Sequence, residues 1–141
     1  MTGKRRSTAI KFTFQKNCFF IFAALFLIEL SIALFIHDSL LRPFVGDVLV
    51  IGLIFTFCKS FIDFRGKDGH WAVGIFLFAC LIELTQFFHL AALLQVGGVM
   101  GIALGATFDW LDILAYAIGA GVIFIWININ HNVPKAASKN K

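Results

Sequence analysis

Four long apolar segments dominate this sequence and restrict the folds it can adopt. They cover about Asn17–Ile36, Asp47–Ile62, Trp71–Leu90 and Trp110–Ile129. Most approach the roughly 20 residues that a helix needs to cross a bilayer, and the second is expected to continue to Phe64. Backbone groups inside a bilayer can bond only to one another, so each segment should be a helix. Hydrophobic residues make up 60% of the chain and charged residues 14%, which leaves too little polar surface for a water-soluble domain. We therefore expect an all-α integral membrane protein with four transmembrane helices.

The basic residues predict how these helices are threaded. Of the 12 Lys and Arg residues, 11 lie in the N-terminal arm, the second loop with its flank, and the C-terminal tail. In a four-helix topology these three segments share one side, and only Arg42 lies on the other. The positive-inside rule then places both termini in the cytoplasm. The chain divides into a basic cytoplasmic arm (1–16), a four-helix transmembrane domain (17–130) and a basic cytoplasmic tail (131–141).

Two alternative threadings arise from the same sequence. Residues 91–107 carry no charge and could form a fifth span, which would put the tail lysines outside. We favour a Gly-rich outer loop or interfacial helix between the third and fourth spans. Ser31–Ala33 also has the small-x-small pattern of a signal-peptide cleavage site. The apolar run resumes at Leu34, which argues against cleavage.

Charge distribution and motif content exclude several classes of function. The net charge is +4, but the basic residues sit at the ends and in one short loop rather than along a folded face. Nucleic-acid binding is therefore not expected. The sequence has no Ser/His/Asp arrangement, phosphate-binding glycine loop or specific metal-ligand motif, so no cofactor or metal is assigned and the question of enzyme activity stays open. The expected partners are membrane lipids, together with either a membrane-protein partner or further copies of the chain.

The acidic residues are distributed in the opposite way. Six of the eight map to the outer half of the membrane or its outer surface, namely Glu29, Asp38, Asp47, Glu83, Asp109 and Asp112. Asp63 and Asp68 lie in the cytoplasmic loop beside Arg65 and Lys67, where they are expected to form a solvated cluster. The outer side therefore carries an excess of negative charge.

Helical spacing gathers several polar residues into stripes. Glu83 and Gln86 share one face of the third span, because residues three apart are neighbours on a helix. Asp109, Asp112 and Tyr116 form a stripe on the fourth. These stripes predict one polar, acidic site that opens to the outer face. Its candidate residues are Glu83, Gln86, Asp109, Asp112, Tyr116, Glu29, Asp47 and Arg42.

Each candidate also has a plainer interpretation. Asp47 and Asp109 lie where helices are expected to begin, and aspartate there caps free N–H groups. A carboxylate within a span, such as Glu83, costs at least about 2.5–3.5 kcal/mol and usually faces the bundle interior, where it either serves function or joins helices. Arg42 either binds lipid phosphate or neutralises the aspartates.

Three short motifs carry a family resemblance. They are RPFVGDVLV at Arg42–Val50, IELTQFF at Ile82–Phe88 and TFDWLDILAYAIG at Thr107–Gly119. Over about residues 20–125 the chain resembles a small bacterial family catalogued as domain of unknown function 2809, and its motif spacing is similar to that of VanZ-like membrane proteins. It departs from the latter where Ala106 replaces an arginine and Tyr116 an asparagine.

The resemblance implies a multi-pass protein of the bacterial inner membrane. VanZ-like relatives are associated with resistance to glycopeptide antibiotics, which act on the outer face. Two functional hypotheses follow. In the first, the acidic site handles an envelope lipid, a lipid-linked precursor or a cation. In the second, the protein is an accessory or structural membrane subunit whose polar residues only hold helices together. A proton or ion path through an oligomer ranks last, because the cytoplasmic halves of the spans lack polar residues.

Overall fold

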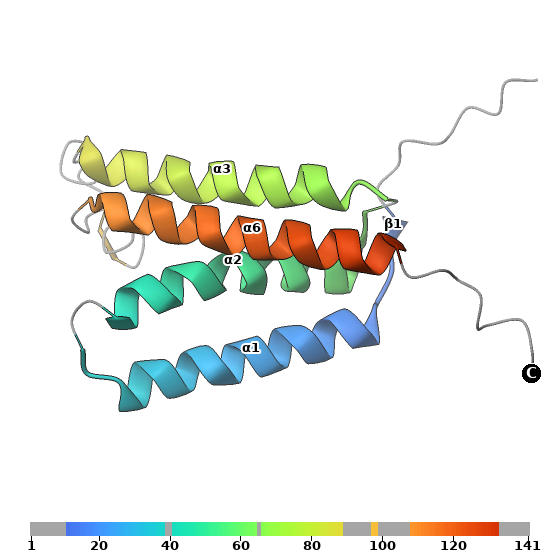
Figure 1. The fold of residues 1–141 in the computed structure, drawn as a ribbon, viewed down its shortest axis with the longest axis horizontal. Helices are drawn as coiled ribbons and strands as arrows, with labels where there is room; N and C mark the ends of the chain where they lie inside the picture. The colour runs from blue at the N-terminus through green and yellow to red at the C-terminus, as the bar shows by residue number, and fades with distance from the viewer. Residues whose placement is uncertain (1–10, 39–40, 65, 89–96, 99–107, 133–141) are drawn as a thin grey trace, which may run out of the picture.

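The protein folds as a bundle of four long antiparallel helices (Figure 1). A computed structural model describes residues 11–38, 41–64, 66–88, 97–98 and 108–132. The helices are α1 (Lys16–Phe35), α2 (Leu41–Phe61), α3 (Asp68–Phe87) and α6 (Trp110–Asn132). Each is long and apolar enough to cross a membrane. The four predicted helices are therefore confirmed.

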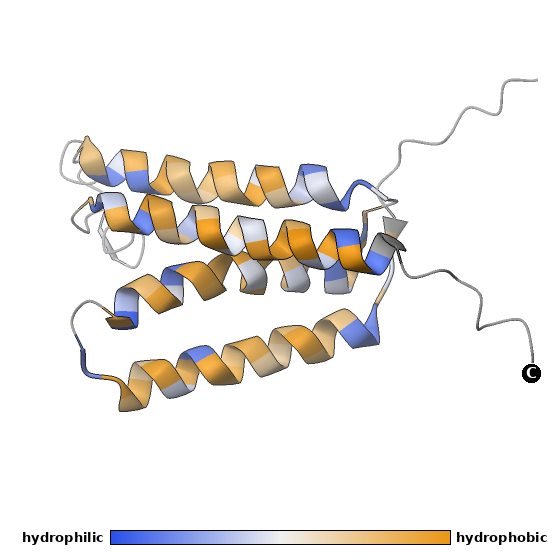
Figure 2. Cartoon of the chain, in the orientation of Figure 1, coloured by the Kyte–Doolittle hydropathy of each residue, from blue (hydrophilic) through white to orange (hydrophobic). Residues whose placement is uncertain are grey.

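The four helices are apolar along most of their length. Apolar residues cover most of each helix, and hydrophilic residues gather mainly toward the two ends of the bundle (Figure 2). Large apolar side chains such as Leu77 and Val122 remain exposed on the outside. In a bilayer such side chains face lipid rather than water, so their exposure carries no hydrophobic cost. The proposed Gly-rich segment at 91–107 lies outside the described residues except for Gly97 and Gly98.

The second helix begins earlier than its hydropathy indicated. α2 starts at Leu41 rather than near Asp47, and the Asp38 carboxylate accepts the Leu41 N–H at 2.8 Å. Pro43 fits in the first turn because the N–H groups there have no partner within the helix. Asp47 consequently lies inside α2, so the prediction that it caps the helix was wrong.

The core lies between α2, α3 and α6. Ile51 and Phe55 of α2 are almost fully buried against Ala72 of α3 and Ile123 of α6. Here α2 and α6 approach closely at Gly119, where an added Cβ would overlap the Val48 carbonyl oxygen and lie 3.2 Å from the Ile51 Cβ. α1 packs mainly against α2. The bundle is thus a three-helix core with α1 attached to one side of it.

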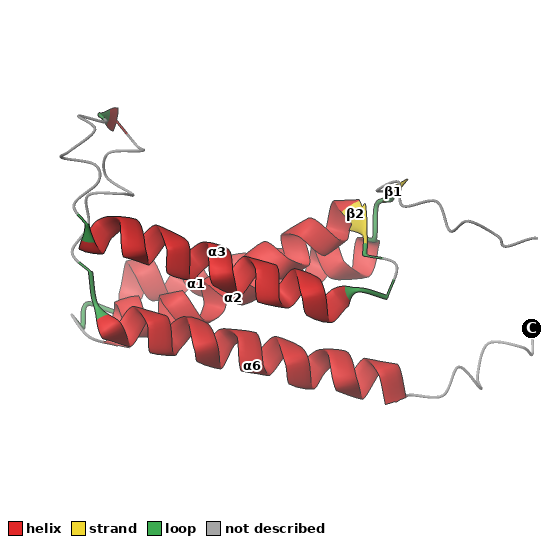
Figure 3. Ribbon diagram, turned by 90° about the horizontal axis from the view of Figure 1, so that it is seen from above, coloured by secondary structure: helices red, strands yellow, loops and turns green. Residues whose placement is uncertain are grey.

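We call the end where α1 begins and α6 ends the terminal end, and the opposite one the far end. At the terminal end two short strands, β1 (Lys11–Phe12) and β2 (Ile62–Asp63), pair in antiparallel fashion (Figure 3). The Thr13 N–H continues this pairing with a 3.0 Å bond to the Phe61 carbonyl. The last residues of the N-terminal arm are therefore tied to the α2–α3 connection.

A lysine joins three helices at the terminal end. Lys59 Nζ of α2 lies 2.7 Å from the Asp68 carboxylate of α3, with side chains only 16% and 17% exposed. The ammonium also lies 5.2 Å from the Trp126 ring centroid on α6, within cation–π range. Asp68 was predicted to lie in a solvated cluster. That prediction was wrong, because the lysine of the preceding helix reaches back to it.

Candidate functional site

Polar residues from three helices meet toward the far end of the bundle. They are Asp47 of α2, Glu83 of α3, and Asp112 with Tyr116 of α6. We call Asp47, Glu83 and Asp112 the carboxyl cluster. Its members lie two to six residues inside the far ends of their helices, which corresponds to depths of about 3–9 Å at 1.5 Å per residue. The cluster therefore lies within the apolar helices but near one end of the bundle.

Asp47 and Asp112 bind one another directly. Their carboxyl groups form a hydrogen bond, and the Tyr116 hydroxyl donates a second one to Asp47. Two carboxylates have only acceptor atoms, so a hydrogen bond between them requires a proton on one of the two. Both side chains are half-buried. The pair can therefore share one proton between α2 and α6.

Glu83 connects this pair to α3. Its side chain is 2% exposed, and Oε1 accepts the backbone N–H of Asp109 at 3.1 Å. The Glu83 carboxyl is also near enough to interact electrostatically with both Asp47 and Asp112. Glu83 thus joins the ends of α3 and α6 and is a third acidic group beside the Asp47–Asp112 pair.

Asp109 has the capping role that its position predicted. Its Oδ1 accepts the Leu111 N–H at 3.0 Å, just before α6 begins at Trp110. This is the usual geometry of an aspartate at a helix N-terminus. The side chain itself is exposed. Asp109 thus borders the carboxyl cluster: its backbone N–H bonds to Glu83, and its carboxylate interacts electrostatically with Glu83 and Asp112.

The remaining candidates lie in three different places. Gln86 is buried in the last turn of α3, on the same face as Glu83. Glu29 of α1 faces Gly46 of α2 and is not among the groups that interact with Asp47 or Asp112. Arg42 is exposed in the first turn of α2. Glu29 and Arg42 are therefore not brought into the carboxyl cluster.

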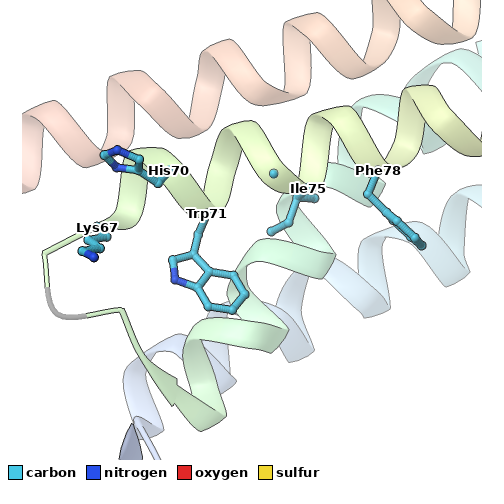
Figure 4. Close-up of a pocket in the computed structure, with 6 residues that line it drawn as sticks. Lys67, His70, Trp71, Ile75 and Phe78 are labelled. Carbon is cyan, nitrogen blue, oxygen red and sulfur yellow. The ribbon is translucent and has the colours of Figure 1, made fainter. Parts of the chain in front are cut away.

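The hollows at the terminal end of α3 do not belong to this site. One of about 360 Å³ is lined by Lys67, His70, Trp71, Gly74, Ile75 and Phe78, and Figure 4 shows these side chains along the first half of the helix. It lies more than a helical turn from Glu83 and shares no residue with the carboxyl cluster. Within the described ranges, no group of three or more His, Cys, Asp or Glu residues is arranged to hold a metal ion.

Sequence reasoning included Asp47 among the site candidates but favoured a helix cap as its role. Its position at the edge of an apolar run suggested a helix cap, whereas its carboxyl bonds to Asp112 and Tyr116 on another helix. Pro43 was the available signal, because proline is common in the first turn of a helix and would have moved the start of α2 ahead of Asp47.

The fold and the site together define a multi-pass helical membrane protein with interacting acidic groups near one end of its bundle. Residues 36–120, more than half of the chain, match the family described as "Protein of unknown function (DUF2809)". The chain belongs to this family. No curated protein and no solved structure matches it. The resemblance to VanZ-like proteins stays a prediction.

Proposed function

We propose that this protein is a multi-pass protein of the bacterial inner membrane that binds a cation at the carboxyl cluster and releases a proton as it does so. The observation that carries the proposal is the hydrogen bond between Asp47 and Asp112 with Glu83 close by. This arrangement of carboxyl groups can hold one shared proton. A cation that entered would take the place of that proton, because both neutralise the same charges.

The charge balance of the surrounding sequence supports a cationic ligand. Residues 36–47 and 88–110, which flank the far ends of the helices, contain a single Lys or Arg, which is Arg42. Carboxylates within a span are stable only when paired or protonated. The chain supplies almost no cation of its own there. The ligand is the ammonium group of an envelope lipid or lipid-linked precursor rather than a metal ion, for which the described residues offer no site.

Proton release tests this proposal. Addition of methylammonium to the purified, weakly buffered protein should release about one proton per chain, because cation and proton compete for the same carboxyl groups. A pH-indicator dye measures the release. Asp112→Asn should abolish it, since an amide neither shares the proton nor ionises. Asp109→Asn is the matched control and should release protons normally. A wild-type protein that releases none would contradict the proposal.

We also propose that the terminal end faces the cytoplasm and the far end the outer side. The 11-to-1 division of Lys and Arg residues supports this orientation. A fluorescent protein fused after Lys141 should therefore fluoresce, and a periplasmic phosphatase fused at the same point should be inactive. An active phosphatase would place the C-terminus outside and favour a fifth span at 91–107.

The second candidate function is that of an accessory or structural subunit. Two observations favour it: the Glu83 carboxylate caps a backbone N–H of the α6 entrance, and Gly119 allows α2 and α6 to pack closely. In this case the polar residues join helices and bind no ligand. Substitutions that remove charge but keep hydrogen bonds separate the two functions.

A further inference from the structure

A second candidate site lies on the other side of α2. There, an apolar groove of about 270 Å³ runs between α1, α2 and α6. Ile21 and Leu25 form one wall, Val122 and Trp126 the other, and Gly52 part of the floor. The groove exists because α1 packs mainly on α2 and leaves α6 uncovered along this side (Figure 1). It covers residues 48–56 of α2, a length of about 12 Å.

A carboxylate stands beyond one end of this groove. Glu29 follows Ile21 and Leu25 at successive spacings of four residues, so all three lie along one face of α1. Its Oε1 lies 2.8 Å from the point where a Cβ on Gly46 would stand, so the glycine allows the carboxylate to rest on α2. Its Oε2 is buried and has no hydrogen-bond partner among the described residues. An ionised carboxylate in this state lacks a compensating charge.

A cationic side chain stands one turn further toward the far end. Arg42 precedes Gly46 by four residues on α2, so the two lie on one face of the helix, about 6 Å apart along its axis. Arg42 is exposed. Three features therefore follow one another along α1 and α2 from the far end inward. They are the positive Arg42, the negative Glu29 about one turn below it, and the apolar groove.

From this order of groups we infer a binding site for a zwitterionic phospholipid with a primary ammonium headgroup. The Arg42 guanidinium receives the phosphate, Glu29 Oε2 receives the ammonium, and one acyl chain lies in the groove. Guanidinium and phosphate are complementary in charge and geometry. The carboxylate and the ammonium complement one another in the same way. The site uses no member of the carboxyl cluster, so it stands independently of the proposed function.

The width of the groove decides between a lipid chain and a protein helix. A helix with its side chains is about 10–12 Å across, far wider than a groove of about 270 Å³ extended along residues 48–56 of α2. A single hydrocarbon chain needs much less room. The groove also opens within the apolar spans, where lipid chains surround the protein.

Native mass spectrometry of the full-length protein tests the inference. The probes are phosphatidylethanolamine, phosphatidylcholine and phosphatidylglycerol with identical acyl chains. Wild type should retain phosphatidylethanolamine over phosphatidylglycerol by about tenfold or more, as expected for a desolvated ion pair. Phosphatidylcholine should bind more weakly than phosphatidylethanolamine, because its methylated ammonium has no N–H to donate to Glu29.

Three variants assign the parts of the site. Glu29→Gln should remove the preference for phosphatidylethanolamine, and Arg42→Gln should weaken the retention of all three lipids. Val122→Trp should fill the groove and displace every lipid, whereas Leu77→Trp should not. Val122 and Leu77 are exposed to similar extents, 57% and 59%, and Leu77 lies on α3 outside the groove.

Equal retention of the three lipids by wild type would overturn the inference without any substitution. So would an unchanged preference in Glu29→Gln, which would mean that Glu29 does not bind the ammonium group. Proton release at the carboxyl cluster should persist in Val122→Trp. Failure of this lipid site is therefore distinguishable from failure of the proposed function.

Discussion

Glu83→Gln and Asp112→Asn are each expected to abolish activity while the protein stays folded and abundant in the membrane. In Glu83→Gln the side-chain amide oxygen would still accept the Asp109 N–H that Glu83 Oε1 now accepts at 3.1 Å. In Asp112→Asn the amide oxygen would still accept a hydrogen bond from a protonated Asp47. Glu83→Gln removes one of the three charges that balance the cation, and Asp112→Asn removes the carboxyl group with which Asp47 shares its proton, so each variant should fail to exchange a proton for a cation. The change in unfolding free energy should stay within about 1 kcal/mol, as for most polar contacts between membrane helices. Complementation of a deletion phenotype, beside membrane abundance and melting temperature in detergent, measures the two effects separately.

Two further variants serve as controls for this prediction. Asp109→Asn should be mild, because asparagine caps a helix about as well as aspartate and the side chain is exposed. Glu83→Leu should lower stability by about 1–3 kcal/mol, since it removes the acceptor of the Asp109 N–H. Normal complementation by both Glu83→Gln and Asp112→Asn would instead support the accessory-subunit function.

Gly119→Val is expected to cause the largest loss of stability. The Val48 carbonyl oxygen and the Ile51 Cβ leave no room for a Cβ at this position, and the Val48 carbonyl belongs to the backbone of a packed helix, which cannot rotate away. Overpacking of this kind costs about 3 kcal/mol or more when the backbone must move. The expected outcome is a marked fall in membrane abundance and in the detergent melting temperature.

Gly121 provides the matched control for Gly119. It lies two residues further along α6, it is exposed, and an added Cβ would meet nothing within 4 Å. Gly121→Val should therefore behave like wild type within about 0.5 kcal/mol, as is usual for surface substitutions. Equal stability of Gly119→Val and Gly121→Val would mean that α2 and α6 do not approach one another as described.

The number of helices followed from the sequence because hydropathy is a strong local signal. The start of α2 did not, since Arg42 and Pro43 interrupt the apolar run although both are compatible with a first helical turn. The error carried over to Asp47, whose interpretation depended on where the helix begins. The Lys59–Asp68 ion pair was also missed, because a spacing of nine residues across a turn has no regular period.

The sequence predicted which candidate residues share a face of one helix, but not which residues of different helices meet. Periodicity placed Glu83 with Gln86, and Asp112 with Tyr116, on single faces. It could not separate Glu29 from them, because these helices are apolar on nearly all sides and show no stripe that marks the inner face. Which helix lies beside which is set by packing, such as the contact of Gly119 with α2.

The joining of α2 to α6 also has a consequence for how the protein is made. Asp47 and Asp112 are 65 residues apart in the chain, which a ribosome translates in about 3–13 s at 5–20 residues per second. During that interval α2 can pair with α1, but Asp47 has no partner on α6. A nascent or truncated chain therefore exposes an unpaired carboxyl group to lipid until the last helix inserts. That group distinguishes an incomplete chain chemically from a complete one.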